Sequence, residues 1–139
     1  MRRTILAGIL LLAACQGSGG GPPSKSPPPP KVILSVQDAA GASGPFAIDA
    51  LVSLTVGVAY DHVPQGPHAL RVDVVSPGGT LYAQLPASID ATGQPSGNVT
   101  HTLQVRGTPI QSFRQVGSWK FSASLDGVVM AETSIDLTR

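Results

Sequence analysis

Three histidines are the side chains of this sequence best suited to metal chemistry. His62 and His68 lie at the two ends of the segment HVPQGPH, and His101 lies much later in the chain. A protein metal site needs ligands that converge, and some of them are usually closely spaced in the sequence. Because no close spacing is present, we expect His62 and His68 to be surface-loop residues and His101 to be partly buried and bonded to the backbone. Weak metal binding through the three histidines is kept as an alternative function.

Serine is frequent, but no serine stands in a pattern that would make it a nucleophile. The G-x-S-x-G turn of serine hydrolases is absent from the sequence. No glycine-rich phosphate loop opens a helix, and the acidic residues are few and scattered, unlike the paired carboxylates of glycosidases. We therefore expect a protein that is not an enzyme and carries no cofactor.

The single cysteine, Cys15, ends the amino-terminal segment MRRTILAGILLLAAC. Two arginines precede an apolar stretch from Ile5 to Leu12, which suits the apolar region of a signal peptide and is too short to cross a bilayer. The ending LAAC resembles the lipobox of bacterial lipoproteins. The resemblance implies cleavage before Cys15 and attachment of a diacylglyceryl group to its thiol. An ordinary signal peptide with an incidental cysteine is the alternative.

Acylation of Cys15 would hold the mature protein on a membrane. Two or more acyl chains anchor a protein durably, because each buried methylene group contributes about 0.8 kcal/mol. Gln16 follows the cysteine, where enteric lipoproteins retained in the inner membrane have Asp. The resemblance therefore implies a lipid-anchored protein of the bacterial cell envelope, at the outer membrane.

A linker follows the cysteine. Glycine, serine and proline dominate this stretch, which ends with four consecutive prolines, Pro27 to Pro30. Such a composition buries too little apolar area to offset the entropy of ordering the chain. The sequence thus divides into a signal peptide (1–14), a linker including the acylated cysteine (15–31) with a reach of at most roughly 40–50 Å, and a globular domain (32–139). A polyproline ligand for a partner is an alternative role for the linker.

Charge in the mature chain is sparse and balanced. The sequence has nine basic and eight acidic residues, and removal of Arg2 and Arg3 changes the formal net charge from +1 to −1. No basic patch suggests nucleic acid as a partner. Because Cys15 is the only cysteine, the domain has no internal disulfide and depends on burial of apolar side chains.

Apolar residues of the predicted domain recur at every second position, which is typical of half-buried strands. In ALVSLTVGVAY (50–60) they run from Ala50 to Tyr60, and in SWKFSASLD (118–126) they include Trp119 and Phe121. Trp119 is therefore expected in the core. Turn sequences SPGGT (76–80) and LDGV (125–128) separate such runs. The predicted strands are 31–37, 50–60, 69–75, 81–85, 99–106, 118–126 and 128–137.

Seven short strands without a convincing helix predict an all-β, immunoglobulin-like (Ig-like) β-sandwich of antiparallel strands, although a transthyretin-like or jelly-roll sandwich would give a similar pattern. Two segments, VGSWKFSASLDGVVMAETSIDL (116–137) and LRVDVVSPGGTLY (70–82), resemble the final hairpin and the central strand pair of bacterial Ig-like domains. The resemblance implies the fold and no ligand. The paired cysteines of antibody-type domains are absent.

Candidate binding residues lie mainly in the predicted connections. Tyr82 is out of phase with its apolar neighbours, so it is expected to be exposed. Two long connections are predicted, 86–98 and 107–117. Arg106, Phe113 and Arg114 lie in or beside the second, and such residues are enriched at protein interfaces.

These features together predict a non-enzymatic envelope lipoprotein whose β-sandwich binds another envelope protein or serves in envelope assembly. A carbohydrate-binding or peptidoglycan-binding module that uses Tyr82 is the second hypothesis. Metal handling by the histidines is the third.

Overall fold

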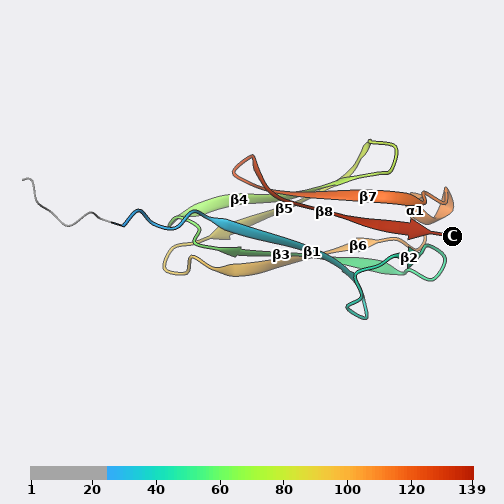
Figure 1. Cartoon of the computed structure of the whole chain (residues 1–139), viewed down its shortest axis with the longest axis horizontal. Coiled ribbons are helices and arrows are strands. Elements are labelled where there is room, and N and C mark those ends of the chain that lie inside the picture. The colour runs from blue at the N-terminus through green and yellow to red at the C-terminus, as the bar shows by residue number, and fades with distance from the viewer. Residues whose placement is uncertain (1–24) are drawn as a thin grey trace, which may run out of the picture.

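Strands of alternating side chains fold into two facing sheets (Figure 1). The computed structural model describes residues 25–139, so Cys15 and the predicted signal peptide lie outside the described residues. The elements are β1 (Lys31–Asp38), β2 (Phe46–Ala47), β3 (Ser53–Asp61), β4 (Pro67–Val75), β5 (Leu81–Asp90), β6 (Gly97–Gln104), α1 (Pro109–Ser112), β7 (Gly117–Leu125) and β8 (Val128–Thr138). β1 thus begins at the last residue assigned above to the linker.

The order of the strands is that of an Ig-like sandwich. One sheet has the order β1-β3-β6 and the other β2-β8-β7-β4-β5. All pairs are antiparallel except β2 with β8. The sheet of β1, β3 and β6 thus faces the sheet that contains β4, β7 and β8. In Ig domains the A, B and E strands face the C, F and G strands in the same way. The predicted all-β, Ig-like sandwich is confirmed.

The core is built from the inward-facing residues of the central strands. Leu54, Val56 and Val58 of β3 are almost completely buried, and so are their counterparts in β4 and β7. Trp119 is 1% exposed, as the alternation of its strand predicts. Each such side chain contributes about 1.5–3 kcal/mol through its removal from water. The sandwich is therefore stabilised by burial, without a disulfide in the described residues.

Several strand boundaries differ from the sequence prediction, and two of the differences are large. β3 begins at Ser53, because Leu51 turns into the core and leaves Val52 exposed. β5 continues to Asp90, well beyond the predicted end, since a proline (Pro86) is tolerated in an edge strand. The expected long connection 86–98 is correspondingly short. The two-residue β2 and the one-turn α1 are too short to show a period and were not predicted.

The Asp-Gly turn between β7 and β8 forms as its sequence predicts. Asp126 and Gly127 have φ angles of 49° and 84°, the left-handed pair that a two-residue hairpin requires. Asp126 also bonds to the neighbouring strand. Its backbone N–H donates to the Ala69 carbonyl (2.8 Å), and its carboxylate accepts the Ala69 N–H (2.9 Å). The turn thereby fastens the β7–β8 hairpin to β4.

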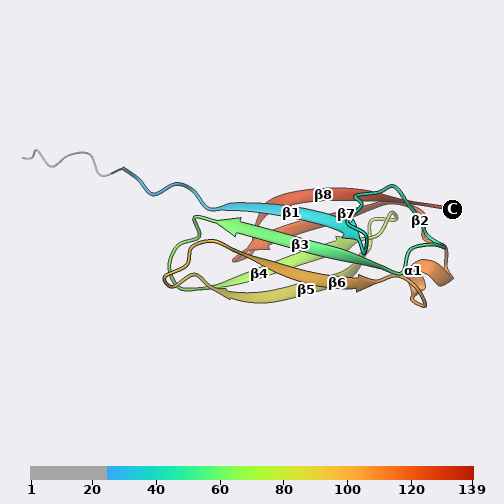
Figure 2. The same cartoon turned by 90° about the horizontal axis from the view of Figure 1, so that it is seen from below.

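The two ends of the sandwich differ in what they carry. At the linker end, Pro27 to Pro30 line a groove together with residues 62–65 and Pro95. At the opposite end lie α1 and the carboxyl terminus (Figures 1 and 2). The helix α1 is a single turn, and residues 25–139 contain no helical segment that could span a bilayer.

Candidate functional site

The connection between β6 and β7, here the α1 loop (residues 105–116), has a buried base. α1 starts with Pro109 at its first position, where the missing N–H is not needed. Ile110 is 0% exposed and fixes the helix to the core. The Thr108 hydroxyl donates to the Val105 carbonyl (2.7 Å). The loop is therefore held at its start by packing and by a local hydrogen bond.

The end of the α1 loop is fixed by Trp119. The indole Nε1–H donates to the Gln115 carbonyl at 2.9 Å, and the Gln115 N–H donates to the Ile110 carbonyl at 2.9 Å. A buried tryptophan needs a partner for this N–H, so the bond also satisfies the core residue. The two ends of the loop are thus tied to the same part of the core.

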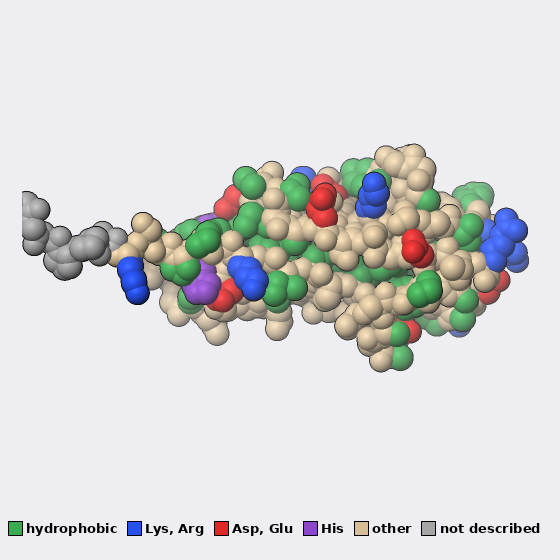
Figure 3. All heavy atoms as spheres, in the orientation of Figure 1, with side chains coloured by type: hydrophobic (Ala, Val, Ile, Leu, Met, Phe, Trp, Pro, Cys, Tyr) green, Lys and Arg blue, Asp and Glu red, His purple; other side chains and the backbone are tan. Residues whose placement is uncertain are grey.

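The tip of the loop between these anchors is exposed. Phe113 is 76% exposed, the highest value among the large hydrophobic side chains of the described residues. Arg114 follows it with φ of 46°, in the left-handed region that favours glycine, and Arg106 is exposed at the start of the loop. Figure 3 shows basic side-chain atoms at this end of the molecule, with acidic side chains beside them and other basic side chains elsewhere on the domain. The structure therefore brings Arg106, Phe113 and Arg114 to one end of the sandwich.

Tyr82 lies elsewhere and is not a free platform. The prediction that it is exposed is wrong, because its ring packs edge-on against Trp119, with centroids 5.3 Å apart and planes at 86°. The cause is a bulge in the pairing of β4 with β5. Val74 pairs with Ala83 and Val75 with Leu81, so Tyr82 is the extra residue and turns inward. Tyr82 is only partly exposed and is therefore ill-suited to stacking on a sugar.

The three histidines do not converge. His101 lies on β6 and is partly buried, as predicted. The expected hydrogen bond to the backbone is not formed by its Nε2 atom, which is buried and has no partner among residues 25–139. His62 is half-exposed beside Asp61 (3.1 Å). His68 is not a surface-loop residue, because it is the second residue of β4 and its side chain is only 14% exposed. Within the described residues no three His, Cys, Asp or Glu side chains form a metal-binding group.

His68 is engaged in a hydrogen-bonded pair. Its Nδ1 lies 2.6 Å from the Asp126 carboxylate and its Nε2 lies 2.9 Å from the Pro64 carbonyl. Both partners are acceptors, so the arrangement favours the doubly protonated ring. The hydrogen bond to Asp126 raises the pKa of His68 most, followed by the hydrogen bond to the Pro64 carbonyl. The His68–Asp126 hydrogen bond also lowers the pKa of Asp126. The pair therefore couples the linker-end loop to the β7–β8 turn.

The stability contributed by this pair is expected to depend on pH. Because the folded pKa of His68 is raised, its contribution is complete below about pH 6.5 and is lost as the pH rises through the folded pKa. Because the folded pKa of Asp126 is lowered, its contribution is fully present above about pH 4, near the unfolded pKa, and is lost as the pH falls through the lower folded pKa. The difference in melting temperature between wild type and His68→Gln should therefore shrink from about pH 6 to about pH 9. A difference that stays constant, measured by circular dichroism, would contradict the pairing.

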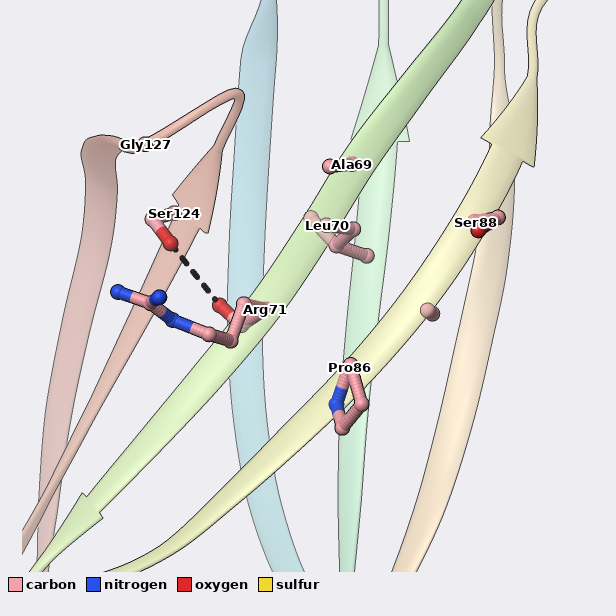
Figure 4. Close-up of a pocket in the computed structure, with 8 residues that line it drawn as sticks. Ala69, Leu70, Arg71, Pro86, Ser88, Ser124 and Gly127 are labelled. Carbon is pink, nitrogen blue, oxygen red and sulfur yellow. Dashed lines mark hydrogen bonds between the residues drawn. The ribbon is translucent and has the colours of Figure 1, made fainter.

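A shallow depression of about 400 Å³ lies on the outer face of the larger sheet (Figure 4). Its lining includes Arg71, Pro86 and Ser124. The Ser124 hydroxyl donates to the Arg71 carbonyl (3.4 Å), and the Arg71 guanidinium pairs with Asp73 (2.9 Å). These polar groups are thus directed at one another, and no base contacts the serine hydroxyl. The depression offers no assembled nucleophile.

Comparison with known proteins identifies a fold and no family. No protein-family profile matches the sequence, and no curated protein matches it. Among solved structures, the chain is similar to β-glucosidase 3B of Thermotoga neapolitana in complex with glycerol (TM-score 0.52, 13% identity, 80% of this chain and 16% of that one). It is also similar to the alkylpurine DNA glycosylase of Pseudomonas fluorescens bound to DNA (TM-score 0.50, 11% identity, 79% and 30%).

An immunoglobulin-like protein of Pseudomonas aeruginosa matches over 81% of this chain and 99% of its own, with 12% identity and a TM-score of 0.43. The chain spans less than a third of the two larger proteins, so only one part of each is similar. At these identities the likeness shows the sandwich fold alone. The fold alone does not determine the activity or the partners of this protein, which depend on its own surface residues.

Proposed function

We propose that this Ig-like β-sandwich is the binding domain of a non-enzymatic, lipid-anchored envelope lipoprotein, and that the α1 loop binds another envelope protein. The observation that carries the proposal is the 76% exposure of Phe113 at the end of the sandwich opposite the linker. A linker that starts at an acylated Cys15 would direct this end away from the lipid surface. The exposed aromatic ring would then be the part of the domain most accessible to a partner.

The α1 loop has the physical properties of a binding site for protein. Burial of an exposed phenylalanine contributes about 1.5–3 kcal/mol, which suffices for a hot-spot residue. Its base is already held by Ile110 in the core and by the Trp119–Gln115 hydrogen bond. Little conformational entropy is therefore lost when the loop binds, and less of the binding energy is spent on ordering.

Charge at the same end indicates the chemistry of the partner. Arg106 and Arg114 belong to the α1 loop, and Arg139 ends the chain at this end of the sandwich. Basic side chains around an apolar anchor favour a partner whose apolar pocket has an acidic rim. Arg114 also keeps a backbone conformation that glycine would adopt more readily, and such strain is often retained at functional positions.

Photo-crosslinking in intact cells tests the proposal. A photoreactive residue at Ser112 should give one discrete adduct with another envelope protein, and Phe113→Ala should lower the adduct yield about tenfold or more, as expected for a hot spot. Arg114→Gly should also lower the adduct yield, because it removes a basic side chain beside Phe113. It should not lower the thermal stability, because glycine adopts the left-handed backbone conformation without strain.

The matched control is Val128→Ala. Val128 is 61% exposed but lies in the hairpin at the linker end, so its removal should leave the adduct unchanged. If no adduct forms from Ser112, or if the adduct is unaffected by Phe113→Ala, the proposed role of the α1 loop is wrong.

A further inference from the structure

The smaller sheet covers the edge strand β5 of the larger sheet only in part. Three strands face five, and β5 and β6 run along the same flank of the sandwich (Figure 2). Burial falls sharply at this flank. The inward residues of β4 (Leu70, Val72, Val74) are at most 1% exposed, whereas Ala83, Leu85 and Ala87 of β5 are only partly buried; Ile89, on the same face of β5, is 6% exposed. The middle of β5 therefore presents a row of apolar side chains that the three-stranded sheet covers only in part.

β6 borders this row with an open edge. Val105 N–H donates to the Val52 carbonyl (3.0 Å), which extends the β3–β6 ladder and sets its alternation. The residues of β6 that alternate with Val105, namely Val99, His101 and Leu103, therefore direct their backbone N–H and C=O groups to β3. The residues between them direct their backbone N–H and C=O groups to the open edge of the sheet. Their side chains are all exposed: Asn98, Thr100, Thr102 and Gln104.

The β6 edge lacks the features that protect the other edges of this sandwich. β5 contains Pro86, β2 is only two residues long, and β1 lies beside β8. Natural edge strands are generally shielded by proline, charge, shortness or a covering segment. β6 has eight residues, with no proline and no Lys, Arg, Asp or Glu. An edge of this kind is suited to pairing with another strand.

We infer that the β6 edge binds an extended, uncharged segment of another protein as an additional antiparallel strand. Such a strand would lie opposite β5. Its inward side chains would be small and apolar, to cover Ala83, Leu85 and Ala87, and its outward ones polar and uncharged, to match Thr100 and Thr102. A second copy of β6 is a poorer occupant. Antiparallel pairing of two β6 strands would put the two linkers at opposite ends, whereas the proposed anchors lie in one membrane.

A synthetic peptide tests the inference on the full-length protein, as it is isolated from the cell, in detergent. The probe has eight residues, the length of β6, with threonine and valine alternating and every valine N-methylated. Only its threonine N–H groups can pair, so it cannot form sheets with itself. Its binding should slow hydrogen exchange at least tenfold, by NMR, at the amides of Asn98, Thr100, Thr102 and Gln104. The amides of Val99, His101 and Leu103 should not change, because they already bond to β3.

Variants separate edge pairing from other binding. Thr100→Pro removes one outward N–H and Thr102→Lys places a charge on the edge, so each should abolish the slowing. Thr55→Lys, on the outer face of the central strand β3, and Phe113→Ala, in the α1 loop, should leave it intact. The result with Phe113→Ala keeps this inference independent of the proposed role of the α1 loop, whereas the preference for another protein over a second copy rests on the proposed membrane anchor. Absence of slowing, slowing that does not alternate along β6, or equal binding of a fully N-methylated peptide would overturn the inference.

Discussion

Trp119→Ala is expected to lower the melting temperature by roughly 15 °C or more, the largest effect of a single core change in this domain. Trp119 is 1% exposed and packs against Tyr82, so its truncation leaves a large cavity. Substitutions of this kind destabilise by about 3–5 kcal/mol. A natural domain of this size has only about 5–15 kcal/mol in total. Thermal unfolding followed by circular dichroism measures the change.

Two further variants separate packing from hydrogen bonding. Phe113→Ala also truncates an aromatic ring, but at a position that is 76% exposed, and should change stability by no more than about 0.5 kcal/mol. Trp119→Phe keeps most of the packing and leaves the Gln115 carbonyl without its donor, at a cost of about 1–3 kcal/mol. It should also speed hydrogen exchange in the α1 loop and lower the yield of the Ser112 adduct. An equal loss of stability in Phe113→Ala and Trp119→Ala would contradict the assignment of Trp119 to the core.

Cys15→Ala is expected to remove the protein from the membrane. The thiol is the only group in the sequence that can take the diacylglyceryl thioether. Without it, both acyl chains and their contribution of about 0.8 kcal/mol per methylene group are lost. A clickable fatty-acid label should fall to background, cleavage before residue 15 should stop, and most of the protein should leave the detergent phase in phase partitioning.

Gln16→Ala is the control for this experiment. It changes the neighbouring side chain and keeps the thiol, so acylation and cleavage should persist. A wild-type protein that takes up no fatty acid, or a Cys15→Ala variant that is still labelled, would remove the basis for the membrane anchor. The Ig-like fold would be unaffected, because it rests on residues 31–139 alone.

The two proposed binding surfaces, the α1 loop and the β6 edge, lie on different parts of the domain. The linker leaves at one end, Phe113 is exposed at the other, and the open β6 edge runs between the two ends. A partner could therefore contact the tip of the domain while an extended segment pairs along its flank. The two sites use different physical interactions, an apolar side chain in a pocket and backbone hydrogen bonds along a strand. Separate variants can disable each one.

The sequence alone determined the features that depend on near neighbours. The alternation of apolar residues in β3 and β7 predicted their inner faces, because side chains of a strand point to opposite sides. It also predicted the burial of Trp119. The Asp126–Gly127 turn followed from the backbone angles that these residues accept.

Only the tertiary structure decided which distant segments meet. His68 and Asp126 are 58 residues apart, and nothing local links them. A bulge against β4 turned Tyr82 inward, and the order of the strands left β6 with an open edge. The exposure of Phe113 likewise depends on how Ile110 and Trp119 hold the α1 loop. Local patterns predict the face of a residue inside a regularly paired strand, but strand partners and bulges are set by packing across the whole chain, which no short stretch of sequence encodes.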